Sequence, residues 1–296
     1  MMADKHNINQ LIKDIRNQIQ LNHTELMDIF EIYAAEAVFG REVIDADLKL
    51  LPASASLLEV GAGSLILSCQ LLREGFQITA LEPFGEGFSH FKSLQKVVLS
   101  VATKTGLQLS IINSPAEQLN VPATFDYAFS INVMEHVANE KQVITNVLKA
   151  LKIGAKYRFI CPNYTFPYEP HFNIPTLFSK NLTERFFKHK ILTCSALKDP
   201  WGTWQSLNWI TVLKIKGIVK HLSHSRVAFR RDLVLKMFER VVSDVEFSKR
   251  RSGWLNAIIG GIVSLRLHKL TAYIPATAQP VIDCVIFKVN SHVTNH

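Results

Sequence analysis

The chain has 296 residues, of which 48% are hydrophobic and 20% are charged, and its formal net charge at pH 7 is +8. This length suits one large domain, and the composition excludes a disordered, collagen-like or coiled-coil chain. The four cysteines lie far apart and form no CxxC pair, so the sequence predicts neither a zinc ribbon nor a disulfide framework, and we expect a reduced, cytosolic compartment.

Residues 1–53 are expected to form N-terminal helices. Apolar residues recur at helical spacing over residues 7–21, and a second helical pattern begins after Thr24 and is predicted to end at Gly40. The first residues are polar and contain no apolar signal segment, which predicts that the chain is not exported.

Residues 54–163 alternate short apolar runs with helical patterns. Such alternation is typical of an α/β fold, in which helices cover both faces of a mostly parallel sheet. Ligands of these sheets bind at the carboxyl ends of the strands. The predicted strands are residues 57–60, 76–81, 107–112, 125–130 and 156–161, and the predicted helices are residues 65–74, 88–105 and 137–151.

Residues 164–296 lose this alternation and are expected to form a substrate-recognition elaboration. Their first part is rich in proline and aromatic residues, and its tryptophans Trp201, Trp204 and Trp209 are predicted to pack in a core rather than to stack on a sugar. The later patterns predict a helix over residues 229–251, a buried or at most interfacial helix over residues 253–265, and a strand over residues 281–289 that returns to the sheet.

Charge is divided unevenly between the two halves of the chain. Residues 1–163 carry 14 Lys and Arg against 17 Asp and Glu, whereas residues 164–296 carry 19 against 8. A basic half indicates an anionic partner, such as a membrane surface, an acidic substrate or a nucleic acid. A solvated surface that only aids solubility is the alternative.

The strongest chemical signal is the turn Gly61-Ala62-Gly63 between a predicted strand and helix. Glycines there let the backbone approach a nucleotide, and Glu82, at the end of the next strand, can accept hydrogen bonds from both hydroxyls of a ribose. This pairing fits NAD as well as S-adenosylmethionine. Ile66 replaces the third small residue of the dinucleotide motif, and Glu59 would repel a pyrophosphate, so the sequence favours the cationic S-adenosylmethionine.

Around this turn the chain resembles the class I S-adenosylmethionine-dependent methyltransferases. The resemblance covers about residues 54–163 and rests on five segments in order, which are residues 59–63, Glu82, residues 114–119, residues 125–137 and residues 151–162. Leu65 departs from the pattern, because many members have glycine there. Residues 162–172 also resemble, more loosely, bacterial methyltransferases that modify cell-surface glycans and lipids.

The resemblance implies a cofactor site and a set of catalytic candidates. His171 and His136 are the candidate general bases, because an imidazole can take a proton from a hydroxyl near neutral pH. No metal site is expected, since Asn132 stands where the resemblance requires an acid three residues before Glu135. The residues expected to bind S-adenosylmethionine are Glu59, Gly61, Ala62, Gly63, Glu82, Pro83, Ala116, Glu117, Ser130 and Asn132.

These features predict a Rossmann-like methyltransferase that acts on a small-molecule, glycan or lipid-linked acceptor, by O-methylation. The basic half leaves an RNA methyltransferase as an alternative, although no base-flipping motif or RNA-binding module is evident. A non-catalytic methyltransferase-fold partner subunit is the other alternative. A cytoplasmic protein is expected, and the basic half permits peripheral contact with an anionic inner membrane face.

Overall fold

The computed structural model of the chain describes residues 7–83, 89–243, 248 and 253–290. Its seven strands have the order β3-β2-β1-β4-β5-β7-β6 in one sheet, which confirms the predicted mostly parallel α/β fold with N-terminal helices. The chain divides into two compact units. Unit 1 comprises residues 1–130 and 146–156, and unit 2 comprises residues 131–145 and 157–296.

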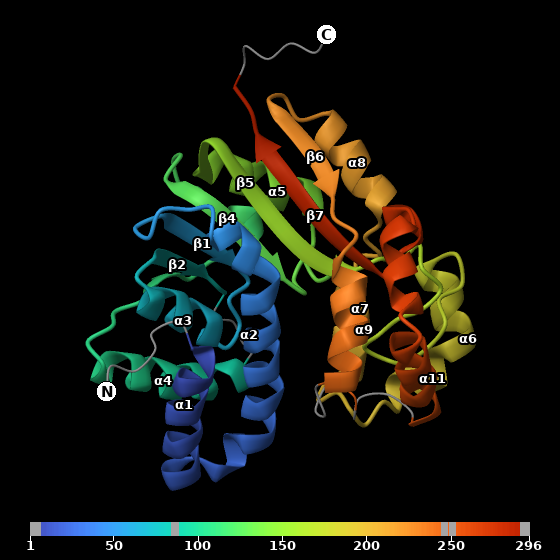
Figure 1. The fold of residues 1–296 in the computed structure, drawn as a ribbon, viewed down its shortest axis with the longest axis horizontal. Coiled ribbons are helices and arrows are strands. Elements are labelled where there is room, and N and C mark those ends of the chain that lie inside the picture. Colours follow the sequence, from blue (N-terminus) through green and yellow to red (C-terminus); the bar gives the residue numbers. More distant parts are fainter. Residues whose placement is uncertain (1–6, 84–88, 244–247, 249–252, 291–296) are drawn as a thin grey trace. The chain divides into compact units, whose positions relative to one another are not determined.

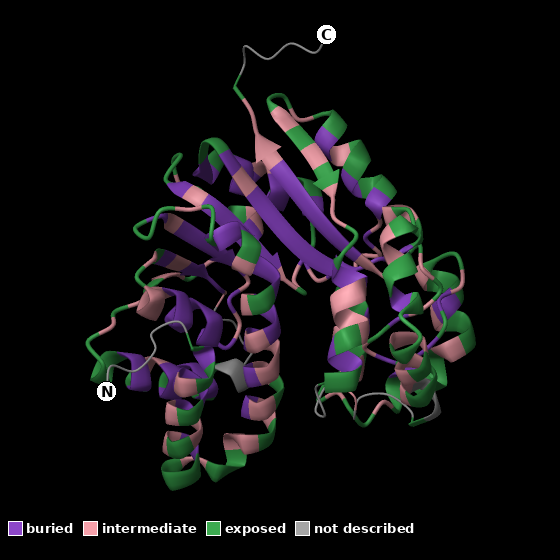
Figure 2. Ribbon diagram, viewed as in Figure 1, coloured by how far each residue is buried: buried purple, intermediate pink, exposed green. Residues whose placement is uncertain are grey.

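The parallel strands of unit 1 are short and buried. Strand β1 (Ser56–Val60) pairs in parallel with β2 (Gln77–Leu81) and with β4 (Phe125–Ile131), and β2 pairs in parallel with β3 (Ser110–Ile112). Almost all of β1 and β4 is buried (Figure 2), as expected for parallel strands covered on both faces.

Four helices of unit 1 pack against one another (Figure 1), and they are α1 (Ile8–Asn22), α2 (Met27–Leu48), α3 (Ile66–Glu74) and α4 (Ser89–Lys104). The α1 prediction is confirmed, because Ile8, Leu11, Ile12, Ile15 and Ile19 form its buried face. The predicted end of the second helix at Gly40 is wrong, since α2 continues to Leu48. Burial of Val43 and Ile44 in the following turn outweighs the roughly 1 kcal/mol that a glycine costs inside a helix.

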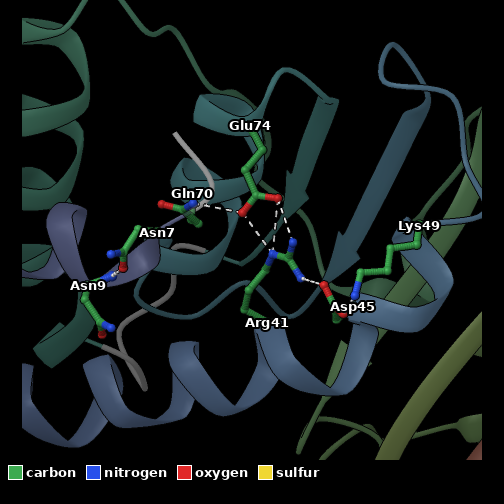
Figure 3. A network of polar contacts seen from close by, with 7 residues as sticks. All are labelled: Asn7, Asn9, Arg41, Asp45, Lys49, Gln70 and Glu74. Carbon is green, nitrogen blue, oxygen red and sulfur yellow. Dashed lines mark hydrogen bonds and ion pairs between the residues drawn. The ribbon is translucent and has the colours of Figure 1, made fainter. Parts of the chain in front are cut away.

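An ion-pair network fastens α2 to α3 (Figure 3). The guanidinium of Arg41 donates from Nε and Nη2 to the two carboxylate oxygens of Glu74, at 2.8 and 2.9 Å, and from Nη1 to Asp45 at 2.9 Å. Gln70 adds a hydrogen bond to Glu74 at 2.8 Å. Because the Glu74 side chain is buried, this bidentate pair fixes the helix whose other end carries the glycine turn.

Unit 2 contains β7 (Val281–Lys288), β6 (Ser225–Phe229) and the second half of β5 (Leu151–Pro162). The predicted return of the last strand is confirmed, and β6, which the sequence did not predict, pairs with it antiparallel. Arg158 of β5 and Asp283 of β7 form a buried bidentate ion pair with distances of 2.9 and 2.6 Å.

Two helix predictions in unit 2 need correction. The pattern over residues 229–251 predicted one helix, but Phe229 ends β6, the helix α9 covers Leu233–Ser243, and most of residues 244–251 lie outside the described ranges. Helix α11 (Gly253–Ser264) has no buried residue among those whose burial is described, and Ile258 is 51% exposed. Its uniform apolarity favoured burial over an interfacial position, yet the helix is largely exposed, and its main contacts in the described ranges are with α9 and the 3-10 segment η4 (Leu267–Tyr273).

The remaining helices of this part are α5 (Glu140–Ala150), which both units share, and α6 (Lys180–Leu192), α7 (Pro200–Ser206) and α8 (Val212–Lys220). Trp204 of α7 is fully buried and its indole N–H donates to Glu184 at 2.8 Å, so the core role predicted for it is confirmed. Trp209 stacks on Tyr164 with ring centroids 4.3 Å apart. Trp201, by contrast, is partly exposed, with the ammonium of Lys188 over its ring.

Candidate active site

The turn after β1 has the backbone that its glycines predict. Gly61 and Gly63 have φ angles of 72° and 50°, in the left-handed region that favours glycine. Leu65 also lies there, with φ 66°, directly before α3. Full burial of the Leu65 side chain compensates a backbone cost of about 1–2 kcal/mol at this position, where the resemblance led us to expect glycine.

Hydrogen bonds join this turn to the end of β2. The N–H groups of Gly61 and Ala62 donate to the carbonyl oxygen of Leu81 at 2.8 and 3.3 Å. The N–H of Gly63 donates to the carboxylate of Glu82 at 2.9 Å, and Gln95 of α4 donates to the carbonyl oxygen of Gly63 at 2.6 Å. The structure therefore brings together the glycine turn and the acidic residue that the sequence singled out.

Two buried carboxylates lie at this turn. Burial raises the pKa of Glu59 to about 8, although the Ser68 hydroxyl donates to it and lowers that pKa, and the charge of Glu82 adds to the rise. Burial also raises the pKa of Glu82, against the hydrogen bond from Gly63. Within the described ranges neither carboxylate forms an ion pair with a basic side chain.

This arrangement fits S-adenosylmethionine. A ribose would supply hydroxyl donors for Glu82, and a sulfonium and an ammonium group would supply the positive charge that the two carboxylates lack. An anionic pyrophosphate would instead oppose the ionisation of both carboxyl groups. The predicted preference for S-adenosylmethionine over NAD thus has an electrostatic basis.

The other predicted cofactor residues are more scattered. Ala116 is buried and Glu117 half-buried in a 3-10 turn whose Glu117 carbonyl accepts a hydrogen bond from Asn146 at 2.7 Å. Pro83 is half-buried beside Glu82, and Ser130 is fully buried in β4. Asn132 is exposed in unit 2, with φ 54°. The cofactor roles of these residues stay predictions.

The candidate bases form a second cluster, which lies in unit 2. One ligand-type atom each of Glu135, His136 and His171 lies within 4.8 Å of the others. Glu135 and His136 belong to the turn between β4 and α5, and His171 belongs to a turn closed by the bridge between Glu169 and Ile174. The two imidazole rings meet edge to face with centroids 5.2 Å apart, so the structure brings together residues that are distant in the sequence.

A buried carboxylate fixes the tautomer of His171. Nδ1 of His171 lies 2.6 Å from the buried carboxylate of Glu169. The same carboxylate also accepts hydrogen bonds from the backbone N–H of Phe172 at 2.8 Å and from the hydroxyl of Tyr164 at 3.3 Å. A carboxylate that receives these hydrogen bonds is an acceptor, so Nδ1 of His171 carries the proton. Its Nε2 is then the basic nitrogen.

A serine fixes His136 in the same way. Nδ1 of His136 lies 2.8 Å from Oγ of Ser206, and that hydroxyl donates its only proton to the carbonyl oxygen of Thr203 at 2.8 Å. Ser206 must therefore accept from Nδ1–H, which leaves Nε2 of His136 unprotonated. Burial and, to a smaller extent, the neighbouring His171 lower the pKa of His136 to about 3, so the ring is neutral.

Sequence reasoning missed the residues that hold this cluster. The side chain of Asn208 donates from Nδ2 to the carbonyl oxygens of Met134 and Val137, at 2.7 and 2.8 Å. Its backbone N–H donates to the carbonyl oxygen of Glu135 at 2.8 Å. Glu169 could have been suspected from its place two residues before His171. No local pattern marks Asn208, because it lies far along the chain from the turn that it holds.

Comparisons with known proteins agree with this geometry. A family model described as a methyltransferase domain matches residues 58–159. An uncharacterized protein of Mycobacterium tuberculosis is 44% identical over an alignment of 295 residues that covers 97% of this chain and the whole of that protein. A ubiquinone biosynthesis O-methyltransferase of Rickettsia prowazekii is 29% identical over 96 residues, 32% of this chain and 35% of that one.

A solved structure shares the fold across most of the chain. It is phosphoethanolamine N-methyltransferase 2 of Haemonchus contortus in complex with phosphomonomethylethanolamine and S-adenosylhomocysteine, with a TM-score of 0.51 and 15% identity. The match covers 93% of this chain and 60% of that one.

Proposed function

We propose that the chain, which belongs to the class I S-adenosylmethionine-dependent methyltransferases, transfers the methyl group of its cofactor to a hydroxyl oxygen. The observation that carries this proposal is the pair formed by His171 and Glu169. Because Glu169 accepts the proton of Nδ1, the imidazole presents a basic Nε2, which can accept a proton from a hydroxyl. The Rickettsia relative, which is named as an O-methyltransferase, supports the same acceptor atom.

The transfer is an in-line displacement at the sulfonium methyl group. The bond between sulfur and methyl carbon breaks, its electron pair stays on sulfur, and the acceptor oxygen forms the new bond to carbon. The hydroxyl proton passes to Nε2 of His171, and the carboxylate of Glu169 stabilises the imidazolium. Glu59, Glu82 and the glycine turn bind the cofactor, whose positive charge offsets the two buried carboxylates.

For the acceptor we propose a hydroxyl on a glycan, a small molecule or a lipid-linked intermediate, and the surface of unit 2 supports the lipid-linked class. Four large apolar side chains on α11, η4 and the link between them are 51% to 81% exposed, and they are Ile258, Leu265, Leu270 and Tyr273. Residues 253–280 contain no Asp or Glu, whereas Arg266 and Lys269 are exposed there. An apolar surface with only basic charges suits an anionic lipid surface.

The membrane contact can be measured directly. No helix in the described ranges has the length and hydropathy needed to span a bilayer. Co-sedimentation with vesicles of anionic lipid should exceed that with neutral vesicles and fall in a Leu270→Glu variant. Equal sedimentation of the chain and this variant would exclude contact through this surface.

The cofactor half of the proposal is tested by calorimetry. S-adenosylhomocysteine should bind, NAD should not, and Glu82→Gln should weaken binding by about 10- to 100-fold, because a hydrogen bond to a charged group contributes about 1.5–3 kcal/mol. Glu42→Gln, at an exposed position of α2 in the same unit, is the matched control. Equal affinity of the Glu82 variant and the unchanged chain would exclude Glu82 as a ribose ligand.

The acceptor half needs isotope-labelled S-adenosylmethionine. Monosaccharides and glycolipids with free hydroxyls should take up label, and the same compounds with blocked hydroxyls should not. His171→Ala should abolish the labelling without changing the affinity for S-adenosylhomocysteine. Label in RNA, or in amines alone, would overturn the hydroxyl acceptor and favour the alternative activities.

A further inference from the structure

We propose that Glu135, His136 and His171 bind one divalent transition-metal ion, with zinc as the best match. The three side chains come from two turns of unit 2 and place their ligand-type atoms within 4.8 Å of one another. Two imidazoles and one carboxylate form a donor set that zinc sites with an open coordination position use.

The protons around the cluster are arranged for metal binding. Each imidazole donates Nδ1–H to an oxygen outside the cluster, His171 to Glu169 at 2.6 Å and His136 to Ser206 at 2.8 Å. Nε2 of His136 lies 4.0 Å from Glu135, and the lone pair of each ring is on Nε2, so we infer that Nε2 is the ligand atom of both histidines. Metal-binding histidines characteristically donate their other N–H to a carboxylate or another oxygen, which fixes the ring and strengthens the ligand.

The distances require only a small contraction. Nε2 of His136 lies 4.0 Å from a carboxylate oxygen of Glu135, and the widest separation in the cluster is below 4.8 Å. Ligand atoms around zinc lie about 3–3.5 Å apart, because each bond is about 2.0–2.2 Å long. Rotations of the three side chains cover this difference, while Asn208 holds the backbone on both sides of Glu135 in place.

The donor types select among metals. Magnesium and calcium prefer oxygen ligands only, whereas imidazole nitrogen suits zinc and its transition-metal neighbours. Glu135 is fully buried, so a divalent cation beside it would meet a carboxylate in a poorly solvated place, where their attraction is strong. The expectation of no metal is thereby revised, because this ligand set does not require an acid at the exposed Asn132.

The ion would also change how an acceptor is activated, a consequence that rests on the proposed function. Three protein ligands leave a coordination position open for a hydroxyl oxygen, and a bound cation lowers the pKa of that hydroxyl. In the metal-bound chain Nε2 of His171 would be a ligand, so the hydroxyl proton would leave to water. The transfer to Nε2 of His171 described above is then the route of the metal-free chain. Metal binding itself is independent of the acceptor and can be measured without one.

The test uses the whole chain, free of any purification tag and treated with a chelator. Titration with Zn²⁺ should show one site, and titration with Co²⁺ should give the visible absorption of a four- or five-coordinate ion. Glu135→Gln, His136→Ala and His171→Ala should each weaken binding at least about 100-fold, and Ser206→Ala about 10-fold, because the serine acts only through His136. His221→Ala, an exposed histidine in the same unit, is the matched control and should bind normally.

Two results would overturn the site: no binding of either ion by the whole chain, or unchanged binding in all three ligand variants. Far-UV circular dichroism and S-adenosylhomocysteine titration of each variant show whether it has folded. Intact cofactor binding and hydroxyl methylation without metal binding would reject only this inference. Metal binding without hydroxyl methylation would reject only the proposed acceptor.

Discussion

Glu59 should make the unfolding free energy of the chain fall as the pH rises. A glutamate has an ordinary pKa of 4.5, and burial raises that of Glu59 to about 8. Between these values the folded state keeps a proton that the unfolded state has lost, so stability decreases until the pH passes about 8. The raised pKa of Glu82 acts in the same direction.

The useful window begins at pH 6.5. The pKa of His136 is lowered from 6.5 to about 3, so below pH 6.5 the unfolded state binds more protons at this residue and stability rises with pH. Above pH 6.5 this opposing effect has ended. One pH unit then changes the free energy by about 1.4 kcal/mol, and the loss from pH 6.5 to pH 8 through Glu59 is about 1.5–2 kcal/mol.

Urea unfolding at pH 6.5 and pH 8, followed by far-UV circular dichroism, measures this loss. Tryptophan fluorescence is unsuitable, because all four tryptophans lie in unit 2 and Glu59 lies in unit 1. Glu59→Gln keeps an acceptor for Ser68 but cannot ionise, so its unfolding free energy should fall much less. Glu25→Gln, at an exposed position, should behave as the unchanged chain does. The reasoning is refuted if the Glu59 variant loses stability as steeply as the unchanged chain.

Three further pairs of variants test the packing. Arg158→Ala should lower the unfolding free energy of unit 2 by about 3–5 kcal/mol, because it leaves Asp283 buried and unpaired. Arg158→Met combined with Asp283→Leu should lower it much less. Tryptophan fluorescence in urea measures both. Leu65→Gly and Leu65→Ala both lose a buried side chain, but only glycine relieves the left-handed backbone, so thermal unfolding should show the glycine variant more stable by about 1 kcal/mol. Trp204→Ala should cost about 3–5 kcal/mol in urea unfolding followed by circular dichroism, and Trp204→Phe less; equal costs would contradict a core role.

The sequence predicted those elements whose own apolar pattern matches their burial. Helix α1 buries one face at helical spacing, and β7 buries a continuous run of five residues, so each pattern is visible in its own segment. Strand β6 was missed because its five residues become a strand only through pairing with β7, and its alternation includes an exposed arginine. The position of helix α11 was predicted but its exposure was not, because a helix that is apolar all round carries no signal for what covers it.

The same distinction holds for the candidate site. The glycine turn and Glu82 follow adjacent strands, and strands that pair in parallel bring their carboxyl ends together, so this contact could be predicted. His136 and His171 were suspected one at a time. Their proximity depends on two turns separated in the chain by α5 and β5, and their tautomers depend on Ser206 and Glu169, which only the folded chain places beside them.

The turn after β1 also shows why a binding site lowers the stability of the chain that carries it. Replacing Glu59 by an uncharged residue should stabilise the empty protein above pH 6.5, so the carboxylate is unfavourable there until a ligand supplies positive charge. A cofactor at 100 times its dissociation constant returns about 2.7 kcal/mol, more than the 1.5–2 kcal/mol lost through Glu59 between pH 6.5 and pH 8. The buried carboxyl groups that are costly to ionise in the empty turn are therefore those whose ionised form a cationic cofactor would stabilise in the folded chain.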